Sequence, residues 1–553
     1  MIFNSVTTEK KLEKLKCLIM SDKKHRERFL VIRKQCSKDY GPDLGHVGEA
    51  VDEKRMPSNT EMLAFYKDLV KKREQKPFAE VEKILRKMKV RSNSGVAVIS
   101  LLTKPYECPG ECIYCPNEKD MPKSYLSKEP AAARALANNF DPYTQTKNRM
   151  RALVANGHPV DKLEVIVIGG TWSSYDEEYQ EYFISEIFRA ANEFGKEKDT
   201  KEEKKKTLED LQEENETADH RIIGLSVETR PDRIDEKELE RLRWLGVTKI
   251  EIGVQHISDE VLKYNKRNTS TKMIIEATEL MKNAGFKVVY HMMPNLPGST
   301  KKKDIKMFND LFKGEEYQPD MLKIYPCVVL KNSELYDLWK EGKFTPYTDD
   351  DLVYVLSEVK KKIPRYVRIL RVIRDIPAEY IVAGSKVSNL RQFIQKNQKE
   401  NNWQCECIRC RQIRNEEVDI EDYVLKRIDY ETLTGKEIFL SFEHKSENKC
   451  SAFCRLRLPD KNTANTFSGD LKILHGASLI RELHTYGRLV EIKKKGDQTQ
   501  HRGFGIRLMN ETERIAKEAG YEKMAVISGV GVREYYKNKL GYSLEGTYMV
   551  KKL

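Results

Sequence analysis

Residues 106–116 read YECPGECIYCP and place three cysteines in a C-x3-C-x2-C pattern, at Cys108, Cys112 and Cys115. The stretch comes shortly after Val96–Leu102, an apolar run that predicts a β-strand. Three thiolates on one tight loop can each ligate one iron of a cubane iron–sulfur cluster, which leaves the fourth iron free to bind a small chelating molecule. A structural zinc loop is the alternative, but zinc needs a fourth ligand, and the next forty residues contain no cysteine or histidine.

Strand-like runs alternate with helical stretches from about residue 96 onward. The strand-like runs after Val96–Leu102 are residues 163–168, 222–227, 249–254, 287–292 and 322–324, and the clearest helical stretches are residues 235–245 and 271–284. This alternation predicts a parallel sheet, with the cysteine loop at the edge where barrel active sites lie. About six strand–helix units are present, fewer than the eight of a closed barrel, so we predict an α/β fold with a partial (β/α)6 barrel over residues 96–395.

An aromatic residue, Tyr114, precedes the last cysteine and makes the loop similar to those of the radical S-adenosylmethionine superfamily. This resemblance implies a 4Fe–4S cluster held by the three cysteines, with the amine and carboxylate of S-adenosylmethionine chelating the open iron. Gly169, Gly170 and Thr171 follow the second strand-like run and fit a backbone site for the methionine end of that cofactor. Glycine pairs are common in ordinary turns, so this motif has weight only beside the cysteine loop.

A second glycine motif lies near the C-terminus, where Gln500, Gly503 and Gly505 form a Q-x-x-G-x-G pattern before a helix-like stretch. Glycines permit a close turn, and the N-terminus of a helix offers free N–H groups to an anion. The pattern resembles the pyrophosphate loop of the GNAT acetyltransferases, in which a tyrosine at the position of Tyr536 meets the coenzyme A sulfur. We therefore predict a separate GNAT-type acetyltransferase domain over residues 435–553.

The composition indicates a large, charged chain of several domains. Its 553 residues exceed what one ordinary core accommodates, and its net charge of +13, from 99 basic and 86 acidic side chains, favours an anionic partner such as nucleic acid. Residues 1–95 are basic and helical in pattern, so we expect them to contact nucleic acid, with a solvated helix face as the alternative. Lys196–Glu216 is almost entirely hydrophilic and predicts a surface insertion. No apolar run is long enough to span a membrane and no secretory leader is recognised, so we expect a cytoplasmic protein.

Together these features resemble the family of the Elongator catalytic subunit, whose members form carboxymethyl groups on tRNA uridines. The resemblance covers the chain from about residue 85 to its end. Besides the cysteine loop, the matching stretches are residues 90–98, 139–143, 169–171, 228–232, 251–255, 291–294, 374–377, 481–484 and 527–531. Few families combine a radical S-adenosylmethionine half with an acetyl-CoA half, so the combination is specific.

The resemblance implies the family's proposed chemistry. Acetyl-CoA is cleaved on the C-terminal domain, and its acetyl group passes to the radical domain. A 5′-deoxyadenosyl radical abstracts hydrogen from the acetyl methyl, and the resulting carbon radical adds to C5 of the wobble uridine to give 5-carboxymethyluridine. The implied partners are the anticodon stem-loop of tRNA, acetyl-CoA and either further Elongator-type subunits or a second copy of the chain.

The resemblance also assigns residues. Lys162 matches a family lysine that contacts acetyl-CoA from the radical domain, and with Tyr536 it is expected to act in catalysis. The implied coenzyme-binding positions are Glu482, Leu483, His484, Thr485, Gln500, Gly503, Phe504, Gly505 and Ile506, together with Lys162 and Tyr536. Three residues separate Tyr536 from Leu540, one more than is usual in the family, which could shift the register of this helix. From the residues alone, Lys162 would pass for a surface lysine.

A second cysteine cluster, Cys405, Cys407 and Cys410, lies in a module at 396–434 that is rich in cysteine, arginine and asparagine. Its C-x-C-x2-C spacing supplies three soft ligands, whereas tetrahedral zinc takes four. Prokaryotic-type members of the family resemble this stretch and carry a structural zinc, so we predict a small zinc linker. Cys327 is the candidate for the fourth ligand, with a histidine or water as the alternative. Three free thiols on a basic loop are the remaining interpretation.

Nucleic-acid contacts are expected where basic residues gather. Besides the N-terminal region, which we expect to bind tRNA, the candidates are Lys147–Arg151 and Arg365–Arg374, in which Tyr366 could stack on a base. Two other functions fit parts of the sequence: a lysine acetyltransferase acting on proteins with an idle radical scaffold, and a non-catalytic tRNA-binding scaffold. The intact cysteine triplet argues against the first, and the intact coenzyme loop argues against the second.

Overall fold

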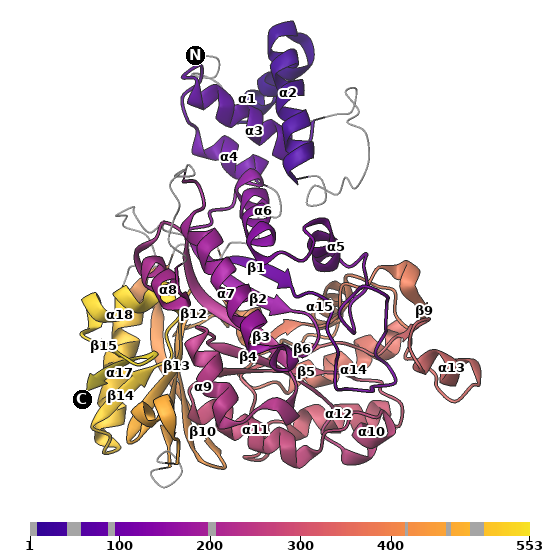
Figure 1. The fold of residues 1–553 in the computed structure, drawn as a ribbon, viewed down its shortest axis with the longest axis vertical. Coiled ribbons are helices and arrows are strands. Elements are labelled where there is room, and N and C mark those ends of the chain that lie inside the picture. Colours follow the sequence, from indigo (N-terminus) through magenta and orange to yellow (C-terminus); the bar gives the residue numbers. More distant parts are fainter. Residues whose placement is uncertain are drawn as a thin grey trace.

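The computed structural model describes residues 8–40, 57–86, 95–196, 206–414, 418–460, 466–486 and 503–553. Two seven-stranded sheets form the body of the molecule, and a group of N-terminal helices stands apart from them at the top of Figure 1. Gln500, predicted to contact the coenzyme, lies outside the described residues. No helix in the described ranges is long and apolar enough to cross a membrane.

The first sheet is parallel throughout, with the strand order β1-β2-β3-β4-β5-β6-β8. Its strands are β1 (Ala97–Leu102), β2 (Lys162–Ile168), β3 (Arg221–Thr229), β4 (Lys249–Gln255), β5 (Lys287–Met292), β6 (Met321–Ile324) and β8 (Arg368–Arg371). The six strand-like runs of the sequence coincide with β1 to β6, and the sheet stays open between β1 and β8, so the predicted partial barrel is confirmed. The count of six units was one too few, because β8 is four residues long, two of them arginines, and carried no strand-like pattern.

Helices cover the outer face of this sheet (Figure 1). They are α6 (Pro142–Ala155), α7 (Glu177–Asn192), α8 (Leu208–Thr217), α9 (Glu236–Trp244), α11 (Thr271–Asn283), α12 (Lys301–Asp310), α14 (Asp349–Lys361) and α15 (Leu390–Glu400). Shorter elements are α5 (Pro130–Ala137), α10 (Asp259–Tyr264), α13 (Leu335–Lys340), α16 (Ile408–Arg411) and the antiparallel pair β7 (Val329–Leu330) and β9 (Ile381–Ala383). Strand β2 shows how the faces divide: Leu163, Val165 and Val167 are buried in the main core, while Lys162 and Glu164 face the other way, as the two-residue repeat of a strand requires.

The hydrophilic segment Lys196–Glu216 is not simply the surface insertion that its composition predicted. Its first part lies outside the described residues, but α8 covers the rest and buries Leu208, Leu211 and Asn215. Asn215 Nδ2 donates to Asn192 Oδ1 of α7 at 2.6 Å, so polar side chains also hold the helix in place. Two leucines at helical spacing anchor a segment whose average composition resembles a solvated loop.

The second sheet has the order β10-β11-β12-β13-β14-β16-β15 and is antiparallel except for the parallel pair β13–β14. Its strands are β10 (Tyr423–Thr432), β11 (Gly435–His444), β12 (Cys450–Pro459), β13 (Ala477–Thr485), β14 (Lys523–Val526), β15 (Ser543–Glu545) and β16 (Tyr548–Lys552). Helix α17 (Phe504–Glu518) packs on β11, β12 and β13, and α18 (Arg533–Leu540) contacts β15, β16 and α8. Strand β10 pairs along its whole length with β11, so the sheet already begins inside the module that was predicted as a linker.

Four helices at the N-terminus form a small bundle with its own apolar core. They are α1 (Thr8–Ser21), α2 (Lys23–Tyr40), α3 (Asn59–Lys71) and α4 (Ala79–Leu85). Within the bundle, Arg33 pairs with Glu61 at 3.2 Å, with both side chains almost fully buried. The bundle meets the rest of the protein at α6, near whose end Thr60 Oγ1 donates to Asn156 Oδ1 at 2.8 Å.

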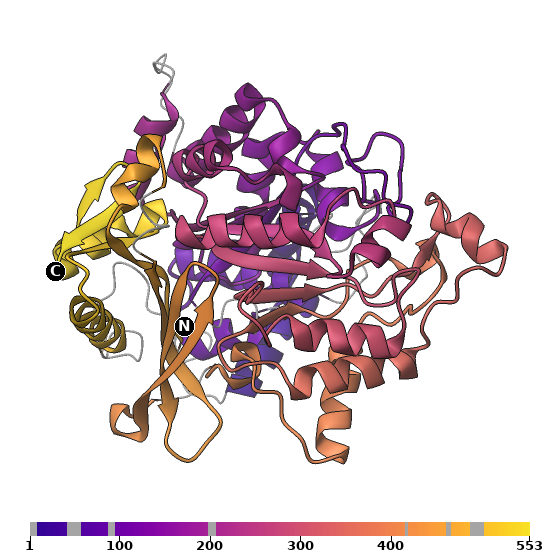
Figure 2. The same ribbon diagram turned by 90° about the horizontal axis from the view of Figure 1, so that it is seen from below.

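Buried ion pairs join the two sheets, which lie side by side in Figures 1 and 2. Asp320, just before β6, receives two hydrogen bonds from Arg481 of β13, at 2.8 Å and 2.5 Å, and lies 3.5 Å from Nη1 of Arg455 on β12. All three side chains are at most 1% exposed. Glu437 of β11 also accepts a hydrogen bond from Arg481, at 3.0 Å. The Asp320 carboxylate therefore ties the amino-terminal end of β6 to the second sheet.

Asp320→Asn should destabilise the protein by about 3–5 kcal/mol, because it leaves buried guanidinium groups without their counter-charge. Burial favours the neutral acid, but Arg481 and Arg455 outweigh it and hold the pKa of Asp320 below its ordinary value. A carboxyl of this kind stabilises the fold above its unfolded-state pKa of about 4, and the contribution is lost as the pH falls through the folded-state pKa. Chemical denaturation followed by circular dichroism across pH measures both effects.

Asp310→Asn is the matched control, because it removes one end of an i,i+4 ion pair with Lys306 near the surface. Its effect should stay below about 0.5 kcal/mol. Equal destabilisation by the two variants, or an Asp320→Asn protein as stable as the wild type, would contradict the role assigned to Asp320.

Candidate active site

One continuous cavity of about 1530 Å³ occupies the inner face of the parallel sheet and extends into the second sheet. Both sheets line it, which brings the two predicted sites into one space. The predicted site residues on its wall are Cys108, Cys112, Cys115, Lys162, Gly170, Thr171, Glu482, Leu483, His484, Thr485, Gly503, Gly505, Ile506 and Tyr536. Gly169 and Phe504 are direct chain neighbours of wall residues.

The cysteine loop lies between β1 and α5, at the carboxyl-terminal edge of the parallel sheet. The three sulfur atoms of this loop, all within the described residues, do not all lie within 4.8 Å of one another. The ligands of a single ion would lie that close together. This spread fits a cluster in which each thiolate takes a different iron. Burial raises the pKa of the Cys115 thiol to about 12, and Cys112 and Cys108 add to the effect, so a positively charged group is needed to hold the loop as thiolates.

Cationic and polar groups surround the loop. Arg267 Nη1 lies 3.8 Å from the Cys112 sulfur, and Thr171 Oγ1 lies 3.7 Å from the Cys108 sulfur. Arg230 Nη1 and Arg267 Nε are buried there without a hydrogen-bond partner in the described part of the chain. Orphaned buried donors are rare in folded proteins, and each needs an explanation such as an absent ligand. The residues present therefore fit a 4Fe–4S cluster with S-adenosylmethionine beside it.

Gly169 and Gly170 turn the chain sharply at the end of β2. Their φ values of +121° and +60° lie in the region that residues with a side chain rarely adopt. A Cβ atom on Gly169 would lie 2.3 Å from Thr103 Oγ1, so this position excludes any side chain. The turn sets Thr171 beside Cys108 and leaves Gly170 on the cavity wall, where backbone groups are accessible to a ligand.

A buried charge network beneath the cysteine loop was missed by the sequence analysis. Lys323 Nζ donates to Glu228 at 3.3 Å and pairs with Glu251, whose carboxylate also lies 2.9 Å from His291 Nε2. Tyr125 donates its hydroxyl to Glu228 at 2.6 Å. Burial favours the neutral acid at Glu251, but Lys323 and His291 outweigh it and lower the pKa. Charged residues at alternate positions of otherwise apolar strands were the signal that could have revealed this network.

The end of the cavity that is predicted to bind the coenzyme opens where β13 and β14 part. The strands pair over Ala477–Ile480 and Lys523–Val526, and β13 then continues to Thr485 with no partner on that side among the described residues. Helix α17 begins directly after Gly503, whose φ of +85° lets the chain turn into the helix. The free N–H groups of its first turn can bind an anion at the mouth of this cleft.

Tyr536 lies on α18 and is buried against Tyr535 and Tyr542, with ring centroids 5.5 Å and 6.0 Å away. The additional residue after Tyr536 is absorbed within α18, which runs unbroken until Gly541 ends it with a φ of +73°. Tyr535 was not predicted, yet it also lines the cavity. A Cβ atom on Gly505 would lie only 3.2 Å from the Tyr535 hydroxyl oxygen.

Lys162 stands at the start of β2 and lines the cavity, so it is not the surface lysine that its sequence context alone suggested. Burial lowers the pKa of its ammonium group, Asp161 opposes this and Arg221 adds to it. Lys162 lies in register with Arg221 at the start of β3. Both side chains are therefore at the amino-terminal edge of the parallel sheet, next to the second sheet.

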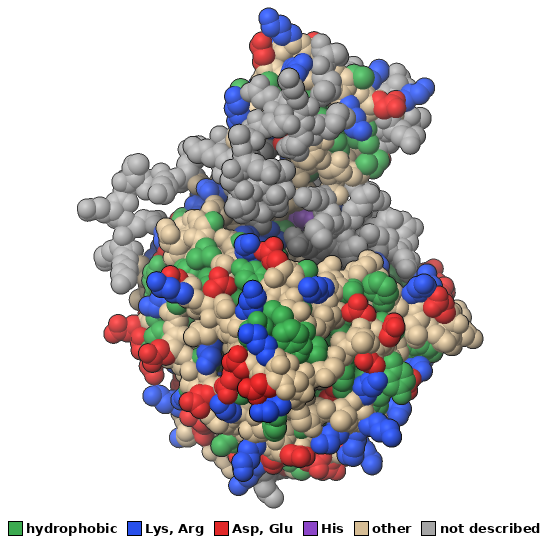
Figure 3. Space-filling model, turned by 90° about the vertical axis from the view of Figure 1, so that its right-hand side faces the viewer, with side chains coloured by type: hydrophobic (Ala, Val, Ile, Leu, Met, Phe, Trp, Pro, Cys, Tyr) green, Lys and Arg blue, Asp and Glu red, His purple; other side chains and the backbone are tan. Residues whose placement is uncertain are grey.

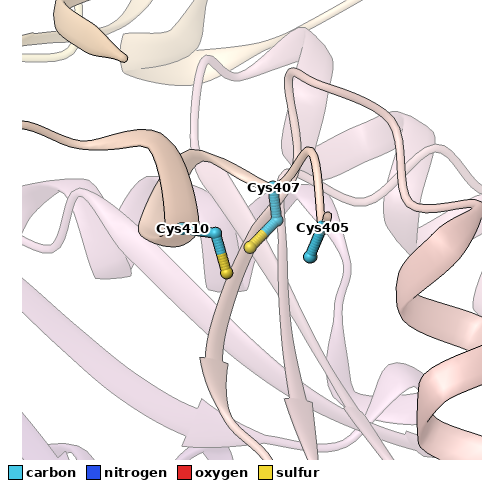
Figure 4. Close-up of side chains that lie close together, drawn as sticks. All are labelled: Cys405, Cys407 and Cys410. Atoms are coloured by element: carbon cyan, nitrogen blue, oxygen red, sulfur yellow. The ribbon is translucent and has the colours of Figure 1, made fainter. Parts of the chain in front are cut away.

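Cys405, Cys407 and Cys410 lie close together, and Figure 4 shows the sulfur atoms of Cys407 and Cys410 next to each other. Their sulfur atoms all lie within 4.8 Å of one another, so a single ion can take all three. Lys360 Nζ lies 3.2 Å from the Cys405 sulfur and 3.7 Å from the Cys410 sulfur. The donor set fits zinc, which binds thiolates tetrahedrally and needs one further ligand here.

Cys327 does not join this triad. It follows β6 at the carboxyl-terminal edge of the parallel sheet and is buried in an apolar cluster with Val261 and Leu296. The triad lies at the opposite edge, because the Ile408 N–H donates to the Val367 carbonyl just before β8, at 2.9 Å. Distance along the sequence offered no guide to the fourth ligand, and the structure removes Cys327 as a candidate.

The basic stretch Arg365–Arg374 is less available to RNA than its sequence predicted. Arg365 and Arg374 pair with glutamates inside the protein. Tyr366 is 5% exposed and stacks on Tyr430 with ring centroids 4.0 Å apart, so it cannot stack on a base. On the face shown in Figure 3, basic and acidic side chains are interspersed, and no continuous basic field covers the described part.

Comparisons with known proteins agree with this arrangement. A model of the Radical SAM superfamily matches residues 102–311, and a model of the Radical_SAM C-terminal domain matches residues 319–400. The chain is 42% identical over 543 residues to the tRNA uridine(34) acetyltransferase of Methanocaldococcus infernus, covering 96% of each protein. It is 37% identical to Elongator complex protein 3 of Homo sapiens, over 85% of this chain and 86% of that protein. The solved structure of Methanocaldococcus infernus Elp3 without its residues 1–46 matches with a TM-score of 0.71 and 41% identity, covering 83% of this chain and 100% of that one.

The triad of Cys405, Cys407 and Cys410 should hold zinc, and Cys407→Ala should lower the zinc content from about one equivalent per chain to a small fraction, because two thiolates bind too weakly to retain it. Inductively coupled plasma mass spectrometry of the dialysed protein measures this. Cys327→Ala is the matched control and should retain full zinc. Zinc lost from Cys327→Ala, or kept by Cys407→Ala, would contradict the assignment.

Proposed function

The chain belongs to the family of tRNA uridine(34) acetyltransferases and Elongator complex protein 3, and we propose that it converts the wobble uridine of tRNA to 5-carboxymethyluridine with acetyl-CoA and a radical S-adenosylmethionine centre. The continuous cavity is the observation that supports this most directly, because the cysteine loop and the coenzyme cleft open into the same space. An acetyltransferase acting on protein lysines would have no use for a cavity that leads to a cysteine loop.

Cys108, Cys112 and Cys115 would hold the 4Fe–4S cluster at one end of this cavity. With S-adenosylmethionine bound, such a cluster supplies a 5′-deoxyadenosyl radical. The chain's own contribution is to bind and shield: Arg267 places a cation beside the Cys112 sulfur, and the backbone of Gly169–Gly170 offers polar groups to the methionine end. The three cysteines are half-buried on the cavity wall, which limits the access of water to the reactive species.

The second sheet with α17 and α18 would form the GNAT-type acetyltransferase domain. The opening between β13 and β14 can receive the pantetheine arm, and the first turn of α17 can bind the pyrophosphate. Burial raises the pKa of Tyr536, and Cys454 and Tyr535 add to the effect, so its phenol keeps its proton and can donate a hydrogen bond to the coenzyme sulfur. Lys162 would contact the coenzyme from the parallel sheet.

Guanidinium groups on the cavity wall offer a site for the anticodon phosphates. Arg368, Arg371, Arg409 and Arg414 all line the cavity. Burial lowers the pKa of Arg409 to about 10, and Arg391 and Arg368 add to the effect by like-charge repulsion. An anion beside these groups relieves the repulsion, and RNA phosphates are the anions that the substrate brings.

Release of coenzyme A from acetyl-CoA by the purified protein tests the proposal, with tRNA, without tRNA, and with a lysine-rich peptide in place of tRNA. Release should rise by about tenfold or more with tRNA alone, because the second substrate completes a coupled site. Anaerobic reaction with S-adenosylmethionine and a reductant should then yield 5-carboxymethyluridine, detected by mass spectrometry of the tRNA nucleosides. An acetylated peptide without any response to tRNA would instead support a protein acetyltransferase.

Cys112→Ala separates the two halves of this reaction. The variant should no longer form 5′-deoxyadenosine or 5-carboxymethyluridine, because one cluster ligand is lost. Coenzyme A release in the presence of tRNA should persist, because the coenzyme cleft does not include Cys112. Wild-type levels of 5-carboxymethyluridine in this variant would refute the radical mechanism.

A further inference from the structure

The cavity wall between the two sites carries charges in an ordered way. Alternate positions on the parallel strands face the cavity, so β4 contributes Lys249 and Glu251, and β5 contributes Lys287 and His291. The strand starts, next to the coenzyme cleft, are mainly cationic. The strand ends, below the cysteine loop, carry the glutamates of the network around Lys323. An anion entering from the coenzyme cleft therefore meets cations first.

Most of these cations already have a carboxylate partner. Lys249 pairs with Glu164, and Lys323 pairs with Glu251. The Lys287 side chain makes no hydrogen bond or ion pair with any residue in the described part of the chain. It is thus an unsaturated ammonium group that points into the space between the two sheets.

The surroundings of Lys287 on the opposite wall belong to the coenzyme cleft. Burial lowers the pKa of the Lys287 ammonium, and Glu482 of β13 acts against this from across the interface. Glu482 already accepts a hydrogen bond from Arg455 Nε at 2.9 Å, so its carboxylate cannot fully neutralise the charge of the Lys287 ammonium group. His484, also on β13, has a buried Nε2 without a partner, and burial lowers its pKa to about 4, so its ring is neutral. An unpaired ammonium beside a neutral imidazole suits a small carboxylate.

We propose that Lys287 binds the carboxylate of acetate released from acetyl-CoA and holds it in the cavity on its way to the radical site. The inference rests on the proposed function. Water adds to the thioester carbonyl carbon, the carbon–sulfur bond breaks, and the products are acetate, the coenzyme A thiol and one proton. An anion in a buried cavity needs a cation whose charge is not already neutralised, and Lys287 meets this requirement where Lys249 and Lys323 do not.

The length of strand β5 explains why acetate needs a binding site between the two reactions. Lys287 and His291 are four residues apart on β5, which is about 13 Å along the strand, so acetate formed at the coenzyme cleft is out of reach of the cysteine loop. At the far end, Lys323 and His291 are already bonded to the carboxylates of Glu228 and Glu251, which repel an anion close to them. Lys287 is therefore where the anion should dwell between the two reactions.

Acetate binding tests the proposal without turnover. Carbon-13-labelled acetate is titrated into full-length protein saturated with coenzyme A, without tRNA or reductant, and followed by nuclear magnetic resonance. Lys287→Met removes the charge but keeps most of the side-chain length, and it should weaken acetate binding by about tenfold or more. Lys287→Arg should retain binding, and Lys302→Met, at an exposed lysine of α12, is the matched control that should leave binding unchanged.

The coupling ratio provides a second readout. In the complete reaction, the 5-carboxymethyluridine formed per coenzyme A released should fall by about fivefold or more in Lys287→Met, and Lys287→Arg should restore it. Acetate binding that is unchanged in Lys287→Met would overturn the proposal. So would an unchanged ratio in this variant, in which 5-carboxymethyluridine and released coenzyme A fall together. Absence of tRNA-dependent coenzyme A release in the wild type would overturn the proposed function instead, while the acetate titration would still decide the role of Lys287.

Discussion

The buried carboxylate of Asp320 lies at the centre of the ion pairs that join the two halves of this protein. It accepts hydrogen bonds from Arg481 of the second sheet and from the Val288 N–H of its own sheet, the latter at 2.8 Å. Buried ion pairs often add little net stability, because desolvation offsets the attraction, but a mispaired arrangement leaves an isolated charge in the interior and is strongly disfavoured. The pair therefore selects one arrangement of the two sheets. Since Asp320 precedes β6, the second sheet is held at the amino-terminal edge of the parallel sheet, opposite the cysteine loop.

Close backbone contact reinforces this arrangement and shapes the cavity. A Cβ atom on Gly529 would lie 2.2 Å from the Ile223 carbonyl oxygen, and one on Gly531 would lie 2.6 Å from Arg221 Cβ, so only glycine lets the second sheet approach β3 so closely. Gly529 and Gly531 form part of the cavity wall at this contact. What remains open is the inner face of the half-barrel, whose alternating charges connect the coenzyme cleft to the cysteine loop. One cavity can thus join two chemistries whose sites stand at opposite ends of the same strands.

Local patterns in the sequence were sufficient for the parts of the fold that depend on neighbours in the chain. The alternation of strand and helix predicted β1 to β6, and the cysteine loop and the glycine motif each came with a recognisable spacing. Strand β8 was not predicted from the sequence, because its four residues, two of them arginines, are stabilised by pairing with β6 and not by their own β-propensity. Helix α8 was not predicted, because its burial depends on two leucines in a segment that is otherwise largely charged.

The sequence by itself determined the cysteine loop, the glycine motif before α17 and the alternation of buried and cavity-facing positions, because each of these depends on residues a few positions apart. Only the tertiary structure decided which distant residues meet. It separated Cys327 from the cysteine triad by the height of the sheet and buried Tyr366 against Tyr430. It also placed Lys287 between the two sheets without an ion-pair partner among the described residues. These outcomes follow from strand register and from the packing of one sheet on the other, and such long-range constraints leave no periodic trace along the chain.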